Sequence, residues 1–328
     1  MTRRVGVLGA GAWGSALAKI IADNGHQVTL WGRDGGLLEA IRESGENTRY
    51  LPGVPLPHLH RLEGDLARAI ESAEILVVAV PSRGVRQVVN QITEFEGPVG
   101  TVTKGIEFET GLTMSGVLAS ELPRSVPVAV SGPNIAQEVA LGMPAATVAA
   151  SADRTVASEV QALLHRPTFR VYTTSDVLGV ELGGALKNII AIAAGVCDGM
   201  GFGDNTKSAL LTRGLAEIRR LGIAVGARAE TFHGLSGLGD LTVTCFSPQS
   251  RNRTFGERLV KGGALDGILA ASRSVIEGVP TSKSAHRLAK KIGVETPVID
   301  EVYQMLHEGK PLSEAVKSLL GRDSKEED

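Results

Sequence analysis

The first half of the chain alternates short apolar runs with longer amphipathic stretches. Seven runs rich in Val and Ile lack a clean polar alternation, as strands buried on both faces of a parallel sheet do. They cover residues 5–8, 27–31, 75–80, 99–103, 127–130, 146–150 and 169–172. Apolar residues at helical spacing lie between them, over residues 15–24, 37–44, 66–71, 83–93, 135–141 and 154–164. This alternation predicts a doubly wound α/β domain, interrupted by an irregular, proline-rich connection over residues 45–57.

After about residue 174 the pattern becomes helical. Apolar residues recur at helical spacing over residues 177–196, 208–221, 253–261, 282–292, 298–306 and 312–320. We therefore predict an α/β protein in which a doubly wound Rossmann-type domain, residues 1–176, is followed by a predominantly α-helical domain, residues 177–328. The longest apolar run, residues 189–196, is far shorter than the ~20 residues of a membrane helix, so no membrane insertion is expected.

Composition and charge narrow the classes of partner. The chain has 328 residues with 34 Lys plus Arg and 36 Asp plus Glu, a formal net charge of −2. No global field attracts nucleic acid or an anionic membrane, so an anionic small molecule has to be held by a few local cations. Only two cysteines occur, which excludes a disulfide framework and favours a reducing, cytoplasmic location. The first apolar run follows the N-terminus directly, so no signal peptide is expected.

A glycine-rich motif follows the first predicted strand. Gly9, Gly11 and Gly14 have the spacing G-x-G-x-x-G, with Ala12 and Trp13 between the last two, and a predicted helix follows. The first glycine permits a tight turn, the second lets a pyrophosphate approach the backbone, and the third lets helix and strand pack closely. The N–H groups at the start of the helix attract the anion. In this position the motif predicts dinucleotide binding, and hence a nicotinamide-dependent dehydrogenase.

The end of the second predicted strand bears on the choice of nicotinamide cofactor. Arg33 precedes Asp34 there, and a guanidinium can hold a 2′-phosphate through paired hydrogen bonds. An acidic residue at this point commonly binds the ribose hydroxyls of NAD. We therefore expect NADP or NAD, with Arg33 favouring NADP, although Arg33 is also interpretable as an ordinary solvated cation.

Lys187 is a candidate proton acceptor in the helical half. Removing hydride from a secondary alcohol requires a base for the hydroxyl proton. Lys187 lies among small and apolar residues, and burial lowers a lysine pKa towards the useful range. On spacing alone, a lysine whose stem follows an apolar seam to solvent is the favoured interpretation.

Two further groups of residues could hold an anion. Ser250 is placed to cap a helix that begins with Arg251 and Asn252, and such a helix start can bind a phosphate. Lys104 ends a strand at the sheet edge where ligands of doubly wound domains gather. The alternatives are an ordinary capped helix start and an ordinary exposed strand-end lysine.

Six motifs occur together in a fixed order: GAGAWG at residues 9–14, TKG at 103–105, SGPN at 131–134, GGALKN at 183–188, GLGD at 237–240 and SRNR at 250–253. Together they closely resemble the bacterial NAD(P)-dependent sn-glycerol-3-phosphate dehydrogenase family, from residue 5 to about residue 321. The resemblance implies interconversion of glycerol 3-phosphate and dihydroxyacetone phosphate for glycerophospholipid synthesis. It also implies a second domain like the C-terminal domain of 6-phosphogluconate dehydrogenase, and a homodimer.

The resemblance assigns roles to individual residues. Lys187 becomes the catalytic proton acceptor, and the substrate-binding residues become Lys104, Gly132, Asn134, Lys187, Asp240, Ser250, Arg251 and Asn252. The cofactor-binding residues become Gly9, Gly11, Ala12, Trp13, Gly14, Arg33, Lys104, Ala136, Arg251, Val275 and Glu277. Many members of the family carry Thr or Ser where this chain has Asn134, which affects the detail of that contact because an amide still forms hydrogen bonds.

Two alternative functions stay open from the sequence. One is a related β-hydroxyacid dehydrogenase, against which the phosphate-type motif at residues 250–252 argues. The other is a nicotinamide-sensing protein without catalysis, against which Lys187 and Asp240 argue. The seven histidines lack metal-site spacing, so no metal is expected.

Overall fold

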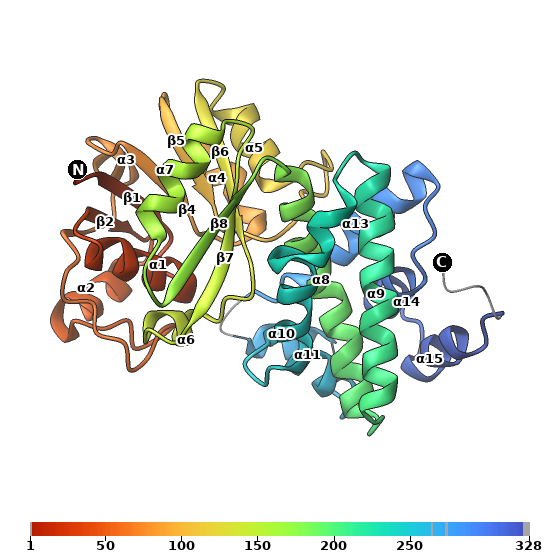
Figure 1. The fold of residues 1–328 in the computed structure, drawn as a ribbon. Helices are drawn as coiled ribbons and strands as arrows, with labels where there is room; N and C mark the ends of the chain where they lie inside the picture. Colours follow the sequence, from red (N-terminus) through yellow and green to blue (C-terminus); the bar gives the residue numbers. More distant parts are fainter. Residues whose placement is uncertain (1, 264, 273–274, 324–328) are drawn as a thin grey trace.

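The computed structural model describes residues 2–263, 265–272 and 275–323. An α/β domain and a helical domain lie side by side, with the start of helix α8 at their boundary (Figure 1). The strands are β1 (Arg4–Leu8), β2 (Gln27–Trp31), β3 (Arg61–Glu63), β4 (Ile75–Val78), β5 (Gly97–Thr101), β6 (Ser125–Ser131), β7 (Ala145–Ala150) and β8 (Phe169–Thr174). All seven predicted strands are present, and β3 is an additional short one.

The strands form one sheet in the order β3-β2-β1-β4-β5-β6-β7-β8. From β3 to β6 the strands are parallel, and this order reverses direction between β1 and β4, where doubly wound domains bind ligands. The prediction that every strand is a buried parallel one was wrong at one end of the sheet. Strand β7 is antiparallel to β6, and β8, at the edge, buries Phe169 and Val171 while Arg170 and Tyr172 are exposed.

The helices of the α/β domain cover the two faces of the sheet (Figure 1). They are α1 (Ala12–Asp23), α2 (Gly35–Ser44), α3 (Leu66–Ile70), α4 (Val85–Val89), α5 (Met114–Glu121), α6 (Ala136–Ala140) and α7 (Arg154–Leu164), with a 3-10 turn η1 (Ser82–Gly84) before α4. Helix α5 was not predicted. Its eight residues include Gly116 and two serines, so its helical propensity is weak and packing stabilises it.

Helices alone form the second half of the described chain. They are α8 (Val177–Gly199), α9 (Asp204–Ala224), α10 (Asp240–Phe246), α11 (Arg251–Val260), α12 (Leu265–Ala271), α13 (Gly278–Ile292), α14 (Pro297–His307) and α15 (Leu312–Leu320), with a 3-10 turn η2 (Ala229–His233) and a π-helical turn η3 (Leu235–Gly239). The predicted helical domain is confirmed, whereas α10 and α12 were not predicted.

Helix α8 is the centre of the helical domain. Among the described helices it alone is long and apolar enough to cross a membrane by length and composition, yet 89% of the relevant window is buried inside the protein. Its Ile189, Ile190 and Ile192 belong to the core shared with α9, α11 and α13. The hydrophobicity of α8 is therefore explained by the core that surrounds it.

The border between the two halves is crossed by one segment of the α/β domain. The stretch between β5 and α5 includes Ile106, which belongs to the core of the helical domain and whose carbonyl accepts a hydrogen bond from Ser284 Oγ at 2.9 Å. The division into residues 1–176 and 177–328 stays a prediction. Residues 264, 273–274 and 324–328 of its second part lie outside the described residues.

Candidate active site

The glycine motif lies in the crevice between β1 and β4. Gly9 has φ +129°, and a Cβ there would lie 2.7 Å from the carbonyl oxygen of Ala79, at the end of β4. A Cβ on Gly14 would lie 1.9 Å from the Gly9 carbonyl oxygen, whereas a Cβ on Gly11 would meet nothing within 4 Å. The first and third glycines are therefore required by packing. The second borders open space where a pyrophosphate could approach the backbone.

The start of α1 leaves its N–H groups available to such an anion. Gly11 is the N-cap, no side chain caps this end, and the first turn has no acidic residue. Ala12 and Trp13 form the first turn, and Trp13 packs edge-on against Phe169 with ring centroids 6.3 Å apart. These residues fit a dinucleotide pyrophosphate at the helix dipole.

Arg33 and Asp34 follow β2, and their side chains differ in whether they have polar partners within the protein. Asp34 caps α2 by accepting the Leu37 N–H at 3.0 Å, and its other oxygen pairs with Arg49 Nη1 at 2.6 Å. Arg33 is exposed and makes no hydrogen bond or ion pair with any other described residue. Both carboxylate oxygens of Asp34 thus already have partners within the protein, whereas the guanidinium of Arg33 is available to a ligand.

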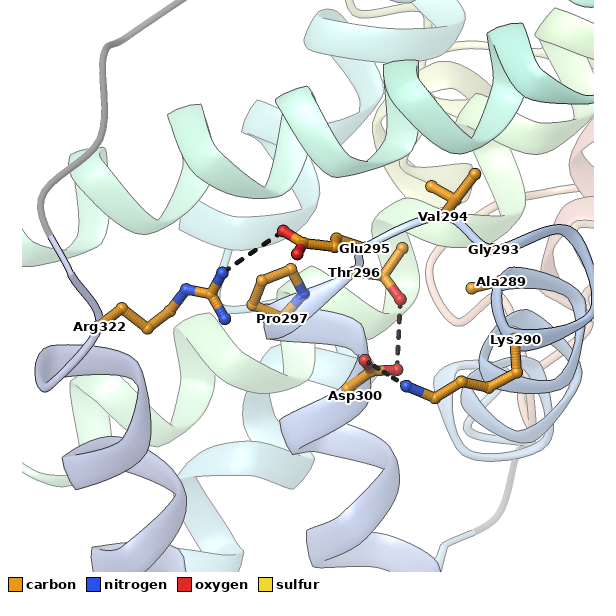
Figure 2. Close-up of a pocket in the computed structure, with 9 residues that line it drawn as sticks. All are labelled: Ala289, Lys290, Gly293, Val294, Glu295, Thr296, Pro297, Asp300 and Arg322. Carbon is orange, nitrogen blue, oxygen red and sulfur yellow. Dashed lines mark hydrogen bonds and ion pairs between the residues drawn. The ribbon is translucent and has the colours of Figure 1, made fainter.

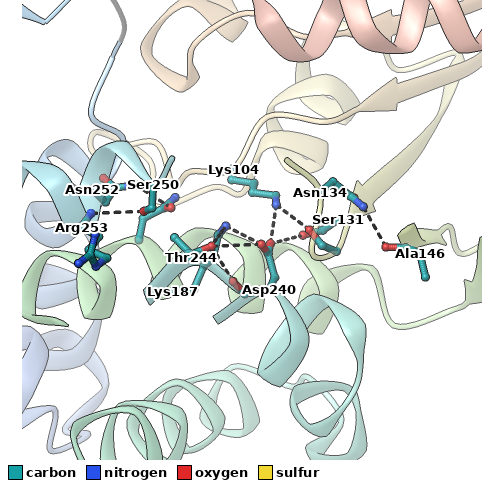
Figure 3. A network of polar contacts seen from close by, with 12 residues as sticks. Lys104, Ser131, Asn134, Ala146, Lys187, Asp240, Thr244, Ser250, Asn252 and Arg253 are labelled. Carbon is teal, nitrogen blue, oxygen red and sulfur yellow. Dashed lines mark hydrogen bonds and ion pairs between the residues drawn. The ribbon is translucent and has the colours of Figure 1, made fainter. Parts of the chain in front are cut away.

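Asp240 is the centre of the polar network that joins the two halves of the protein (Figure 3). Its Oδ1 accepts a hydrogen bond from Lys187 Nζ at 2.5 Å, and its Oδ2 pairs with Lys104 Nζ. Lys104 Nζ also donates to the Gly132 carbonyl oxygen at 3.2 Å. One carboxylate therefore aligns two ammonium groups, one from each half of the protein.

Close backbone approaches make this meeting possible. A Cβ on Gly184 would lie 2.4 Å from Ser131 Oγ at the end of β6, and a Cβ on Gly183 would lie 2.6 Å from the Ser236 carbonyl oxygen in η3. Asp240 continues the π-helical turn η3 as the first residue of α10. The two glycines therefore let the end of β6 and η3 come close to the helix that carries Lys187.

Burial and charge tune Lys187. Its side chain is 8% exposed and Asp240 is 1% exposed. Burial lowers the pKa of Lys187, the Asp240 carboxylate raises it in part, and the nearby ammonium of Lys104 lowers it again; together these effects bring the pKa to about 8. An amine with this pKa can hold or release a proton near neutral pH.

The predicted phosphate site begins one helix away. Ser250 caps α11 by accepting the Arg253 N–H at 3.3 Å. Arg251 is exposed, and its Nη1 donates to the Val275 carbonyl oxygen at 2.9 Å. Asn252 is buried between two helices, and its contacts tie the start of α11 to the helix that carries Lys187.

The side-chain amide of Asn252 makes two hydrogen bonds to other helices. Its Nδ2 donates to Asn188 Oδ1 at 2.9 Å, and its Oδ1 accepts the Gly278 N–H at 2.9 Å. Asn188 directly follows Lys187 on α8, and Gly278 begins α13. Asn252 therefore fixes the relative position of three helices at this site.

The remaining predicted residues of the α/β domain lie after β6. A Cβ on Gly132 would lie 2.9 Å from Thr147 Cα, so this position accepts only glycine. Asn134 Nδ2 donates to the Ala146 carbonyl oxygen at 2.9 Å. Ala136 begins α6 and packs against the core of the α/β domain.

Glu277 connects the helical domain to the cofactor crevice. Its Oε1 accepts the Ser82 N–H at 3.0 Å and its Oε2 accepts the Ser82 hydroxyl at 2.5 Å. Ser82 begins η1, shortly after β4. Glu277 is thus held at the edge where the glycine motif lies, which is consistent with a place beside the cofactor.

The sequence missed two members of the central network. Thr244 Oγ1 accepts a hydrogen bond from Lys187 Nζ at 2.6 Å, and Ser131 Oγ lies 3.5 Å from Asp240 Oδ2. Thr244 lies four residues after Asp240, which places both on one face of a helix. That spacing could have identified Thr244 if α10 had been recognised.

A separate hollow of about 370 Å³ lies between α13 and α14. Lys290, Thr296, Asp300 and Arg322 are among its lining residues, and it contains none of the predicted site residues (Figure 2). Within the described residues no group of three or more His, Cys, Asp or Glu side chains could hold a metal ion.

Comparison with known proteins identifies the family. The model of the NAD-dependent glycerol-3-phosphate dehydrogenase N-terminus matches residues 4–157, and that of the C-terminus matches residues 176–317. The glycerol-3-phosphate dehydrogenase [NAD(P)+] of Geobacter sulfurreducens is 48% identical over 100% of this chain and 99% of its own length. That of Moorella thermoacetica is 48% identical over 98% and 97%.

Solved structures agree with the sequence relatives. Glycerol-3-phosphate dehydrogenase from Coxiella burnetii superposes with a TM-score of 0.94 and 37% identity, covering 98% of this chain and 99% of the other. The enzyme from Saccharomyces cerevisiae gives a TM-score of 0.81 and 27% identity, covering 97% and 99%. This chain belongs to the NAD-dependent glycerol-3-phosphate dehydrogenase family.

Proposed function

We propose that this chain is a glycerol-3-phosphate dehydrogenase that interconverts dihydroxyacetone phosphate and sn-glycerol 3-phosphate with NADPH or NADH, and that Lys187 is its proton donor and acceptor. The observation that carries the proposal is the pairing of Lys187 and Lys104 on one buried carboxylate, Asp240. Family membership favours this function over a β-hydroxyacid dehydrogenase and over a cofactor sensor without catalysis.

Lys187 would handle the proton of the reaction. When bound, the nicotinamide supplies or accepts the hydride at the substrate carbon. In reduction, the ammonium of Lys187 donates a proton to the oxygen that was the carbonyl, and in oxidation the neutral amine takes it back. Asp240 and Thr244 orient Nζ through hydrogen bonds of 2.5 and 2.6 Å. Lys104 adds a second positive charge that stabilises the developing oxyanion.

The substrate phosphate would lie at the start of α11. Ser250, Arg251 and Asn252 combine a hydroxyl, a guanidinium and an amide at a helix start, where free N–H groups attract an anion. The net charge of −2 makes a local cation necessary for this purpose. Gly132 and Asn134 would complete the substrate site from the α/β domain.

The cofactor would extend from the glycine motif towards both domains. Gly9, Gly11, Ala12, Trp13 and Gly14 would hold the pyrophosphate at the start of α1. Ala136, Val275 and Glu277 would border the cofactor, together with Lys104 and Arg251, which also face the substrate. We propose a preference for NADP because Arg33 is available to a 2′-phosphate, while Asp34 is engaged with α2 and Arg49.

Location and assembly form part of the same proposal. Both cysteines are free and buried, as expected in a reducing cytoplasm. The family suggests a homodimer, which light scattering of the purified protein would test. The division into residues 1–176 and 177–328 is supported by the start of α8 at Val177.

Steady-state kinetics tests the function. Dihydroxyacetone phosphate with NADPH or NADH is expected to give a loss of absorbance at the nicotinamide band, and no turnover with either cofactor would refute the proposal. Lys187→Ala is expected to lower kcat by about 10²–10⁴-fold while leaving the Kd for NADPH unchanged. Lys207→Ala is the matched control, because Lys207 is 7% exposed and pairs with Asp198 as Lys187 pairs with Asp240. It should lose stability and keep its turnover.

A further inference from the structure

Helix α8 carries a second buried ionisable side chain, Glu181, that the proposed reaction does not use. Its Oε1 accepts the Ser115 N–H at 2.7 Å, and its Oε2 accepts the Ser115 hydroxyl. Ser115 lies in the first turn of α5, in the α/β domain, where backbone N–H groups lack helical partners. The N-cap residue of α5, Thr113, makes no capping hydrogen bond with its own side chain. Glu181 therefore caps α5 from the other half of the protein.

The helix that Glu181 caps, α5, directly follows the segment that carries Lys104. This segment, residues 102–113, runs from β5 to α5 and is held at its middle by the bond from Ser284 to the Ile106 carbonyl. Glu181 fixes its far end on α8. Because Lys104 lies at its near end, the position of Lys104 depends on how the segment is docked.

Glu181 precedes Lys187 by six residues on the same helix. We propose that Glu181 is a positioning residue that docks residues 102–113 on α8, so that Lys104 Nζ reaches Asp240 beside Lys187. The inference rests on the proposed function, because it concerns the group that carries the proton. It adds a role for a carboxylate that touches neither substrate nor cofactor.

Loss of this docking should change the titration of Lys187. The groups that face Lys187 are Asp240, Thr244 and Cys245 of α10, and Lys104 of the docked segment. The positive charge of Lys104 lowers the pKa of Lys187. If the segment moves away, this like charge is withdrawn and the pKa of Lys187 rises. A change that only lowers stability would leave that pKa unaltered.

The chain offers a matched control in Glu217. This buried carboxylate of α9 accepts the N–H groups of Val298 at 2.8 Å and Ile299 at 3.2 Å, and so caps α14. Glu181 and Glu217 are thus both buried glutamates, and each caps a helix other than its own. Glu217 does so inside the helical domain, away from the network around Asp240.

The experiment compares Glu181→Ala, Glu181→Gln and Glu217→Ala with the wild-type enzyme. We measure kcat/KM for glycerol 3-phosphate oxidation against pH, below the melting temperature of every variant. Glu181→Ala is expected to lower kcat about 10- to 100-fold. It should also move the midpoint of the rise of kcat/KM with pH upwards by roughly half a pH unit or more. Glu181→Gln keeps an acceptor for the Ser115 N–H and a donor for its hydroxyl, so it should restore both values.

The outcomes separate positioning from stability. If Glu181→Ala loses stability as Glu217→Ala does, but keeps the wild-type midpoint and kcat, the proposal is overturned. Should Glu181→Ala fail to fold, Ser115→Ala decides. It removes the Ser115 hydroxyl and keeps the Ser115 N–H as a donor to Glu181, so it should move the midpoint of the pH profile less, in the same direction. An unchanged midpoint in Ser115→Ala overturns the proposal. Failure of the proposed function itself is distinguishable, since the wild type would then not turn over.

Discussion

At the scale of single residues, the arrangement of one carboxylate between two ammonium groups governs the behaviour of the site. Asp240 is almost fully buried and pairs with both Lys104 and Lys187. Leaving either cation without this partner would bury an uncompensated charge, which is costly. The three side chains therefore act as one unit.

The pKa of Lys187 predicts opposite pH profiles for the two directions of the reaction. Oxidation needs the neutral amine, so kcat/KM for glycerol 3-phosphate should rise with pH and level off above about 8. Reduction needs the ammonium, so kcat/KM for dihydroxyacetone phosphate should fall above the same pH. Initial rates between pH 6.5 and 9.5 in both directions measure this, and profiles that change in parallel would contradict the assignment.

Arg33 predicts how the cofactor preference can be changed. A hydrogen bond to a charged group is worth about 1.5–3 kcal/mol, so Arg33→Ser should raise the KM for NADPH roughly tenfold or more and leave the KM for NADH unchanged. Arg42→Ser, at an exposed position of α2, is the control and should change neither value. Equal changes for both cofactors would show that Arg33 does not contact a 2′-phosphate.

Sequence patterns identified part of the site for definite reasons. The glycine motif was recognisable because a strand and a helix flank it, and Lys187 because of the family motif around it. Thr244 was missed because α10 was not predicted, and Glu181 because a capping contact between distant segments leaves no local spacing. The bonds between Asp240 and the two lysines join residues 53 and 136 positions apart, which periodicity cannot reveal.

At the scale of elements, the crossing of α8 and α11 holds the proposed phosphate site against the lysine. A Cβ on Gly195 of α8 would lie 1.9 Å from the Arg253 carbonyl oxygen, and a Cβ on Gly256 of α11 would lie 2.1 Å from the Ile192 carbonyl oxygen. The two helix backbones therefore touch, and the start of α11 is placed by contact with α8.

Gly195→Ala is expected to push the two helices apart. Overpacking costs about 1–3 kcal/mol, and displacement of α11 should raise the KM for dihydroxyacetone phosphate more than the KM for NADPH. Thermal unfolding and steady-state kinetics measure the two effects. Gly267→Ala in α12 is the control, because a Cβ there meets nothing within 4 Å. If Gly195→Ala matches it in stability, the proposed close contact is wrong.

Elements with strong periodicity were predictable, and those stabilised by their surroundings were not. Helices α1, α7 and α8 and every strand except β3 follow the apolar pattern of the chain. The antiparallel direction of β7 was not foreseen, because a short run of small apolar residues, Ala145 to Ala150, gives no indication of direction. Direction is decided by the connection between β6 and β7, which includes α6.

At the scale of the whole molecule, buried carboxylates make the free energy of unfolding depend on pH. Burial raises the pKa of Glu217 to about 7, above its ordinary value of 4.5. The folded protein then binds more protons than the unfolded chain between these values, so the contribution of Glu217 to stability is lost as pH rises from about 4.5 to 7.

Glu217→Gln should remove this dependence. The difference in melting temperature, variant minus wild type, should become larger from pH 5 to pH 8, by the equivalent of up to about 3 kcal/mol. Differential scanning calorimetry at both pH values measures the difference. A constant offset between the two proteins would contradict the prediction, because a Gln side chain does not titrate.

The reversal between β6 and β7 has a consequence for how the chain tolerates changes of length. Because β7 and β8 run opposite to β6, the chain leaves the sheet at the edge away from the cofactor crevice, and α8 returns along β6. Val180 packs against Ala129, and Gly184 reaches Ser131. The number of residues from Val177, where α8 begins, to Leu186 therefore determines the position and direction of the Lys187 side chain. A single inserted residue would turn its side chain by about 100° and advance it by about 1.5 Å, so this stretch should accept neither insertions nor deletions.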